Sequence, residues 1–427
     1  MAKSGDREGH MGSVMQHGHV HTDRKLGALE HLFWLIDKHR PLHFTMTGHV
    51  VGKTDVAAWR TALDALQRRN ALMSAAIEAA EEGPFFRQRK NARIPLRIVE
   101  GDPGRSWQAE VAAELGAPFS EKDSPLIRAV LIHADGAAAI TLAAHHSIAD
   151  GFSLAYAIRD ILSTLAGNPP PTLPQTPSED ELFDAGPPEP IPTQYAPAAD
   201  ALPPVPKGYH LRDGSNPFVS SLSLPQQLTA QLRARARAES TTVHCALATA
   251  LTFAARKLST AWSTIPIRVW SPVNMRPVLN AGEHCGNYLG SASSSFGLET
   301  DAFWDLARRM GAEIAPAKTR SGLHAALSAV RDFISSGPDV AGAAGFASVA
   351  FAHEAVLTNL GVLPFPIQYG PLRLQRVWGP CILPDFEDMQ SVGVATIGGE
   401  ACLTHSSYSP ILGLLEEMHT KLLLATA

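Results

Sequence analysis

The sequence predicts an α/β (α+β) protein made of two subdomains. Runs with strand-like alternation and runs with helical periodicity follow one another along the chain. At 427 residues the chain is long for a single hydrophobic core, so two domains are the default expectation. Residues 168–206 carry a dense run of prolines and few apolar positions, which is typical of an extended, solvent-exposed linker.

These observations divide the chain into four segments. We expect a flexible N-terminal tail over residues 1–25, an N-terminal subdomain over 26–167, a Pro-rich linker over 168–208 and a C-terminal subdomain over 209–427. The tail is polar and contains four histidines, and a mobile terminus explains it better than a metal site does.

Periodicity and turn residues predict the individual elements. Helices are expected over residues 26–39, 56–70, 154–166, 225–239, 242–258, 301–310, 322–334 and 410–424, and strands over 43–51, 127–132, 138–142, 219–224, 265–271, 391–397 and 401–407. Asp135-Gly136 and Gly398-Gly399 predict hairpin turns. The Gly/Ala-rich stretch 337–345 is expected to be a loop.

Composition restricts the class of protein. With 45% hydrophobic and 18% charged residues the chain is globular, and a net charge of −5 gives it no general attraction for nucleic acid or anionic membranes. Its four cysteines are widely spaced, so neither a disulfide framework nor a zinc site is indicated. No apolar run approaches the length of about 20 residues that spans a bilayer. We expect a cytoplasmic monomer.

The most informative stretch is His145-His146-Ser147-Ile148-Ala149-Asp150-Gly151. It follows a strand-like run and precedes a helix-like run, so its polar residues fall on a strand-to-helix turn. Neighbouring histidines on a strand point to opposite faces, so one can enter a cavity while the other packs into the protein. This geometry argues against a shared metal ion.

These seven residues match the pattern HHxxxDG, and the sequence resembles the acyltransferase superfamily related to chloramphenicol acetyltransferase. That superfamily includes nonribosomal peptide condensation domains, and this chain is closest in type to free-standing polyketide-associated acyltransferases of the phthiocerol dimycocerosyl transferase kind. Further similar segments are Pro272 to Arg276, Gly286-Asn287 and Thr358 to Gly361. The resemblance implies two similar subdomains, each a mixed sheet flanked by helices, that form a V-shaped cleft with a through tunnel.

The resemblance also implies roles for individual residues. The catalytic motif would be His146 as general base with Asp150 and Gly151, where Asp150 forms a buried ion pair with Arg276 and Gly151 leaves room for a pantetheine arm. His145 would be structural. Asn359 is a candidate oxyanion donor or acceptor contact. No covalent acyl-enzyme is expected, because neither Ser153 nor the cysteines have a base placed for them.

The expected reaction is transfer of an acyl group from a phosphopantetheine thioester, on coenzyme A or an acyl carrier protein, to the hydroxyl of a natural-product or lipid acceptor. No bound cofactor or metal is expected. The basic residues Arg87, Arg89, Lys90 and Arg93 offer a docking place for a carrier protein or coenzyme A, and a solvated strand edge is the alternative.

Two other functions stay open. One is a free-standing condensation enzyme that forms an amide with an amine acceptor, and the other is a non-catalytic condensation-like scaffold. Ester formation is favoured because the chain is a single condensation-like unit with no carrier, adenylation or membrane segment attached.

Overall fold

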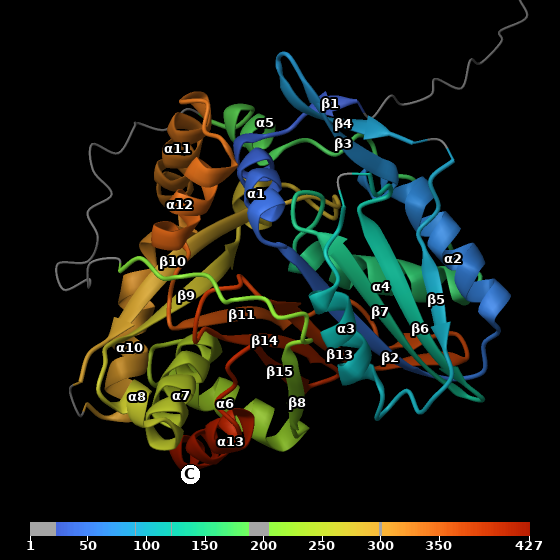
Figure 1. The fold of residues 1–427 in the computed structure, drawn as a ribbon. Helices are drawn as coiled ribbons and strands as arrows, with labels where there is room; N and C mark the ends of the chain where they lie inside the picture. Colours follow the sequence, from blue (N-terminus) through green and yellow to red (C-terminus); the bar gives the residue numbers. More distant parts are fainter. Residues whose placement is uncertain (1–22, 90, 121, 188–204, 299–300) are drawn as a thin grey trace, which may run out of the picture.

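The computed structural model describes residues 23–89, 91–120, 122–187, 205–298 and 301–427. Within them the chain forms two halves, each built on a six-stranded mixed sheet flanked by helices (Figure 1). The predicted fold class is confirmed. The N-terminal sheet has the strand order β12 (Gln368–Tyr369), β13 (Leu372–Ile382), β2 (His43–Val51), β7 (Ala137–His145), β6 (Ile127–Ala134), β5 (Leu96–Val99). The C-terminal sheet has the order β10 (Leu289–Phe296), β9 (Ile267–Asn274), β11 (Ala355–Val362), β14 (Gln390–Ile397), β15 (Glu400–Ser407), β8 (Phe218–Leu224).

The central strands of the N-terminal sheet carry the predicted motif. β2 and β7 pair antiparallel over their whole length, from His43 opposite His145 to Val51 opposite Ala137. Both faces of this pair are covered by helices, which explains the small, apolar side chains of β7. His43 Nε2 lies 2.8 Å from the carbonyl of Glu114 in α3 (Trp107–Gly116). On the other face α4 (Gly151–Leu165) packs closely, since a Cβ at Gly48 would lie 2.8 Å from Ile158.

The remaining N-terminal elements complete the layers around this sheet. They are α1 (Ala28–His39), α2 (Val56–Arg69), the 3-10 turn η1 (Ala71–Ser74) and a small separate sheet of β1 (Arg24–Lys25), β4 (Gly83–Gln88) and β3 (Ala75–Ala80). Figure 1 shows α1 at the junction of the two halves, where it packs on the C-terminal helices α11 (Arg320–Ser335) and α12 (Val340–Ala350). The broad apolar stripe of α1 is therefore buried between the halves.

Three features differ from the predicted division of the chain. Arg24 and Lys25, which were predicted to belong to the flexible tail, pair with β4 as strand β1, and Arg24 is buried against Glu30. Residues 209–427 were expected to form the C-terminal subdomain, but β12 and β13 cross over and join the N-terminal sheet, where β13 pairs with β2. This pairing covers the backbone of β2, which would otherwise be an exposed edge. Within the predicted linker, residues 188–204 lie outside the described residues, and 179–184 form helix α5 (Glu179–Asp184) instead of an extended chain. Ser178 caps α5 and Phe183 is buried.

The C-terminal half contains the predicted helices with small shifts at their ends. Its other helical elements are α6 (Gln226–Ala238), α7 (Val243–Leu258), α8 (Thr260–Ser263), α9 (Arg276–Leu279), α10 (Phe303–Ile314), η2 (Pro316–Lys318) and α13 (Leu414–Thr426). The expected loop at 337–345 is wrong from residue 340 on, because α12 begins there with Asp339 as its N-cap. Its alanines favour a helix. None of the described helices is long and apolar enough to cross a membrane.

Candidate active site

The motif forms a rigid turn between β7 and α4. The chain leaves β7 at His145, and Ile148 N donates to His145 O at 3.1 Å. Asp150 is the N-cap of α4, where its Oδ1 accepts from Ser153 N at 2.9 Å. Because strand and cap fix both ends of the turn, the two histidines have fixed and opposite directions.

His146 is buried in an aromatic pocket. Its ring centroid lies 4.9 Å from that of Phe33 and 4.7 Å from that of Phe44. Asn287 Nδ2 donates to the His146 carbonyl at 2.9 Å and lies 3.5 Å from Nδ1. Burial lowers the pKa of His146 to about 4, against the opposing effects of backbone hydrogen bonding and the charge of Asp150. The imidazole is therefore neutral near pH 7 and free to accept a proton.

His145 points the other way and acts as a structural brace. Its Nδ1 accepts from Ser147 N at 3.0 Å, so the proton is on Nε2, which lies 3.2 Å from Asp37 Oδ2. Asp37 also accepts from Leu42 N at 2.6 Å. Burial opposes ionisation of Asp37, but His145 and this hydrogen bond together bring its pKa below the usual value. The pair fastens α1 to the end of β7.

Asp150 connects the two halves of the protein. Its Oδ2 is in direct contact with Arg276 Nη1 and accepts from Tyr288 N at 3.2 Å. Ser153 Oγ accepts from Arg276 Nη2 at 3.0 Å and lies 2.9 Å from Asp150 Oδ1. The ion pair expected between Asp150 and Arg276 is thus present and joins α4 to α9. Asp150 and Ser153 both bind Arg276 and each other, so neither is arranged as part of a catalytic triad.

Two small cavities meet at His146. The first, of about 50 Å³, is lined by Phe44, His146, Asp150, Gly151, Phe152, Trp270, Pro272, Asn274, Leu289, Val356, Thr358, Asn359, Leu360, Pro380 and Ile382. The second, of about 20 Å³, shares His146, Trp270 and Ile382 with the first and is otherwise almost wholly apolar. Phe152 and Asn274 also line an open depression of about 490 Å³ that includes Arg276. The three spaces are thus neighbours, since each shares lining residues with the next.

Gly151 lines the first cavity at a closely packed point. A Cβ built on it would lie 2.7 Å from Pro380 Cγ and 2.9 Å from Leu360 Cδ2. Because both neighbours line the first cavity, a side chain at 151 would have to push them aside or fill the space. The close packing therefore favours glycine at position 151, and the passage of a pantetheine arm there stays a prediction.

Asn359 is one of the residues that line the first cavity. It ends the regular pairing of β11, and its Oδ1 accepts from Gly361 N at 2.8 Å. No partner for its Nδ2 occurs among the described residues. The amide group is therefore oriented by its oxygen, and its N–H groups are available.

The structure does not bring the basic cluster to His146. Arg87 lies at the end of β4 and Arg89 directly after it. Arg87 Nη1 lies 3.1 Å from Asp23, and Arg89 contacts Glu78. Arg93 contacts Asp64. Lys90 lies outside the described residues. Acidic neighbours thus offset the charge of each described arginine in the cluster.

Several neighbours of His146 carried no signal for function in the sequence. Asn287 belonged to a Gly-Asn segment whose role was not evident, and Phe33, Phe44 and Trp270 looked like ordinary core residues. Nothing local connects them with His146, since they come from α1, β2 and β9 and meet only in the folded chain. Among the described residues, no group of three or more His, Cys, Asp or Glu side chains is arranged to hold a metal ion.

With this geometry in place, comparison with known proteins gives two family matches. Residues 35–180 match the family model described as condensation domain, and residues 214–379 match the one described as phthiocerol/phthiodiolone dimycocerosyl transferase C-terminus. The region around the motif thus resembles condensation domains, and most of the C-terminal half resembles phthiocerol/phthiodiolone dimycocerosyl transferases, both of which are acyl-transferring enzymes.

Solved structures show the same fold. Polyketide synthase associated protein 5 from Mycobacterium tuberculosis is 21% identical, with a TM-score of 0.62 over 95% of this chain and 98% of that one. The first condensation domain of the calcium-dependent antibiotic synthetase, in complex with a substrate analogue, is 15% identical, with a TM-score of 0.66 over 95% and 97% of the two chains. A stretch of 117 residues is 28% identical to tyrocidine synthase 3 of Brevibacillus parabrevis. That stretch is 27% of this chain and 2% of the much longer relative.

Proposed function

We propose that this protein transfers an acyl group from a phosphopantetheine thioester, on coenzyme A or a carrier protein, to the hydroxyl of a natural-product or lipid acceptor. The observation that carries the proposal is His146, a neutral imidazole at the meeting point of two cavities. A general base needs this combination of protonation state and access. The scaffold alternative does not explain why cavities reach the ring.

The reaction requires one proton acceptor and stabilisation of one oxyanion. His146 takes the proton from the acceptor hydroxyl as its oxygen attacks the thioester carbonyl and the C–O bond forms. Asn359 Nδ2 donates to the resulting oxyanion. When the intermediate collapses, the C–S bond breaks, and the leaving sulfur takes the proton from the His146 imidazolium. The products are an ester and a free pantetheine thiol.

No protein nucleophile is needed for this sequence of steps. Ser153 Oγ is held by Arg276, Asp150 and Gly286 in the network between the halves. Cys285 is the cysteine nearest the turn, with its Sγ 3.4 Å from Ile148 O. Burial raises the pKa of its thiol to about 12, so the reactive thiolate is absent at neutral pH. We infer direct transfer from donor to acceptor.

An amine acceptor is the second candidate, and the match of residues 35–180 to the condensation-domain family favours it. An assay in which an alcohol and an amine compete for the same donor distinguishes the two functions. The protein is incubated with acyl-coenzyme A or an acylated carrier protein and an equimolar pair of an alcohol and the matching amine, and the products are identified by mass spectrometry. The ester should dominate, with little product from His146→Ala. Amide as the main product would assign the chain to the condensation enzymes. No product from any thioester donor with either acceptor would contradict both.

A further inference from the structure

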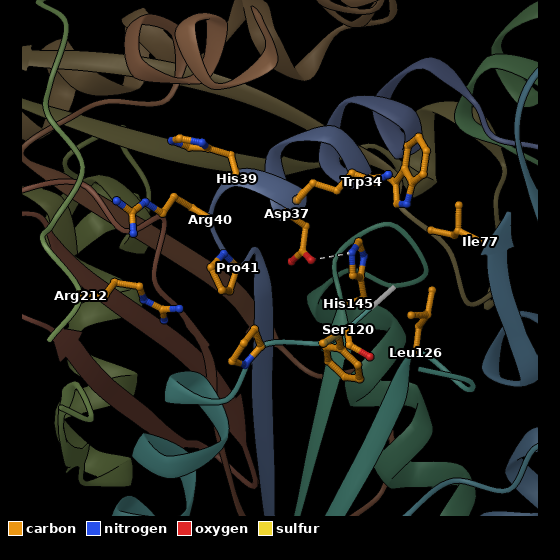
Figure 2. A pocket seen from close by; sticks show the side chains of 13 residues that line it. Trp34, Asp37, His39, Arg40, Pro41, Ile77, Ser120, Leu126, His145 and Arg212 are labelled. Carbon is orange, nitrogen blue, oxygen red and sulfur yellow. Dashed lines mark ion pairs between the residues drawn. The ribbon is translucent and has the colours of Figure 1, made fainter. Parts of the chain in front are cut away.

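A larger cavity, of about 420 Å³, lies on the opposite side of the motif from His146. It is formed by the C-terminal turns of α1, the segment before β6 and Arg212, as Figure 2 shows. None of its lining residues lines the two cavities that meet at His146. The contact of His145 Nε2 with Asp37 Oδ2 lies between its two ends (Figure 2). It is therefore a separate site that touches the structural histidine and not the base.

The two ends of this cavity have different chemistry. Trp34, Ile77 and Leu126 gather at one end, and Arg40 and Arg212 lie at the other (Figure 2). At this end, Lys38 Nζ lies 3.9 Å from the centroid of the Trp34 ring, so its ammonium group covers one face of the indole and leaves the rest of the ring as apolar lining. A ligand that fills this cavity has an apolar body and a charged head.

The arginine end has more positive charge than its protein partner can neutralise. Arg40 Nε lies 3.9 Å and Arg212 Nε 3.4 Å from the same carboxylate oxygen of Asp385. Arg212 Nη2 also donates to Tyr408 Oη at 2.9 Å. Arg40 Nε is buried without a hydrogen-bond partner among the described residues, and the guanidinium carbon lies 5.7 Å from the centroid of the Tyr209 ring. Donors of this kind are costly to bury unless an acceptor meets them.

We propose that this cavity binds a small amphiphilic carboxylate, with its head group on Arg40 and Arg212 and its aromatic or short alkyl body against Trp34, Ile77 and Leu126. A guanidinium pairs with a carboxylate through two parallel hydrogen bonds, which suits the uncommitted donors of Arg40. Asp37 is ionised at the middle of the cavity, so the body must be uncharged and a second negative charge there is disfavoured. The site thus selects a monocarboxylate over a dianionic phosphate.

The test compares 4-phenylbutyrate with 4-phenylbutanol, which has the same body and no charge, by isothermal titration of the full chain. The acid should bind saturably with one site and at least ten times more tightly than the alcohol. Arg40→Gln and Arg212→Gln should each weaken binding of the acid about 5- to 20-fold and leave the alcohol unchanged. Trp34→Ala should weaken both ligands. Thermal melts in the absence of ligand show whether each variant is folded.

Two further variants separate this site from general charge and from the catalytic cavity. Arg105→Gln removes one positive charge from an exposed arginine that pairs with Asp102, and it should leave binding unchanged. Gly151→Val narrows the route to His146 and should also leave binding unchanged. The proposal is overturned by absence of saturable binding at millimolar acid, by equal affinity for the alcohol, by an equal loss in Arg105→Gln, or by loss of binding in Gly151→Val. Because no turnover is measured, these outcomes are independent of the proposed function.

Discussion

Removal of either partner of the Asp150–Arg276 pair should destabilise the protein strongly. Both side chains are buried, and breaking a buried pair leaves an uncompensated charge at a cost of about 3–5 kcal/mol. Asp150 also caps α4, a contribution of about 1 kcal/mol. We therefore expect Asp150→Ala to lower the free energy of unfolding by about 4–6 kcal/mol and Arg276→Met by about 3–5 kcal/mol. The double variant should cost much less than the sum, with a coupling energy of about 2–3 kcal/mol.

The assay is urea unfolding of the wild type, both single variants and the double variant, followed by tryptophan fluorescence. Asp55 is a matched control for the capping contribution. It caps α2 at an exposed position, where its Oδ1 accepts from Ala58 N at 2.8 Å, and it forms no ion pair with another described residue. Asp55→Ala should cost about 1 kcal/mol. Strict additivity in the cycle, or a loss in Asp150→Ala no larger than in Asp55→Ala, would refute the reasoning.

A second buried ion pair serves as a control that distinguishes an effect on stability from an effect on transfer activity. Arg268 Nη2 lies 3.0 Å from Glu354 Oε1, and both residues belong to the C-terminal half. A cycle on this pair should show a similar coupling energy. Transfer activity of its folded variants should stay near that of the wild type, whereas folded Asp150 and Arg276 variants should transfer more slowly because the turn that holds His146 is released. Equal effects of both pairs on activity would show that the link between the halves does not position the base.

The other predictions concern the reaction. His146→Ala should lower kcat/KM about 100- to 10,000-fold with an unchanged melt, and wild-type turnover in the folded variant would remove the assigned role. Since burial lowers the pKa of His146 to about 4, the neutral form should persist on acidification, and kcat/KM should show no loss near pH 6.5 and fall only as the pH drops through about 4. An acid limb at pH 6.5 would contradict this. Gly151→Val should reduce kcat/KM for the thioester at least about tenfold, and an unchanged value would place the donor on another route. Reversing Arg87 and Arg89 to Glu should slow transfer from a carrier-bound donor in a salt-sensitive way and spare a short pantetheine analogue. Equal loss with both donors would exclude docking at β4.

The local structure around the motif could be predicted from short stretches of sequence. The alternation before His145 and the helical periodicity after Gly151 predicted the strand-to-helix turn, and the period of a strand predicted that the two histidines diverge. Asp135-Gly136 predicted the hairpin that delivers them. Each of these inferences depends on backbone geometry within a few residues. The family resemblance then implied that Asp150 pairs with Arg276.

Other features depended on contacts between distant segments. Nothing in residues 372–382 indicates that this strand leaves its own half to pair with β2, because sheet pairing across hundreds of residues leaves no periodic mark. Asn287 reaches His146 only after the halves close. The cavity of about 420 Å³ lined by Arg40 and Arg212 exists only once α1 and the segment after the linker meet. The sequence determined which groups are present and how each lies on its own element. Burial, and with it the low pKa of His146 and the shape of each cavity, was decided by the tertiary structure, since exclusion of water depends on every segment packed around a site.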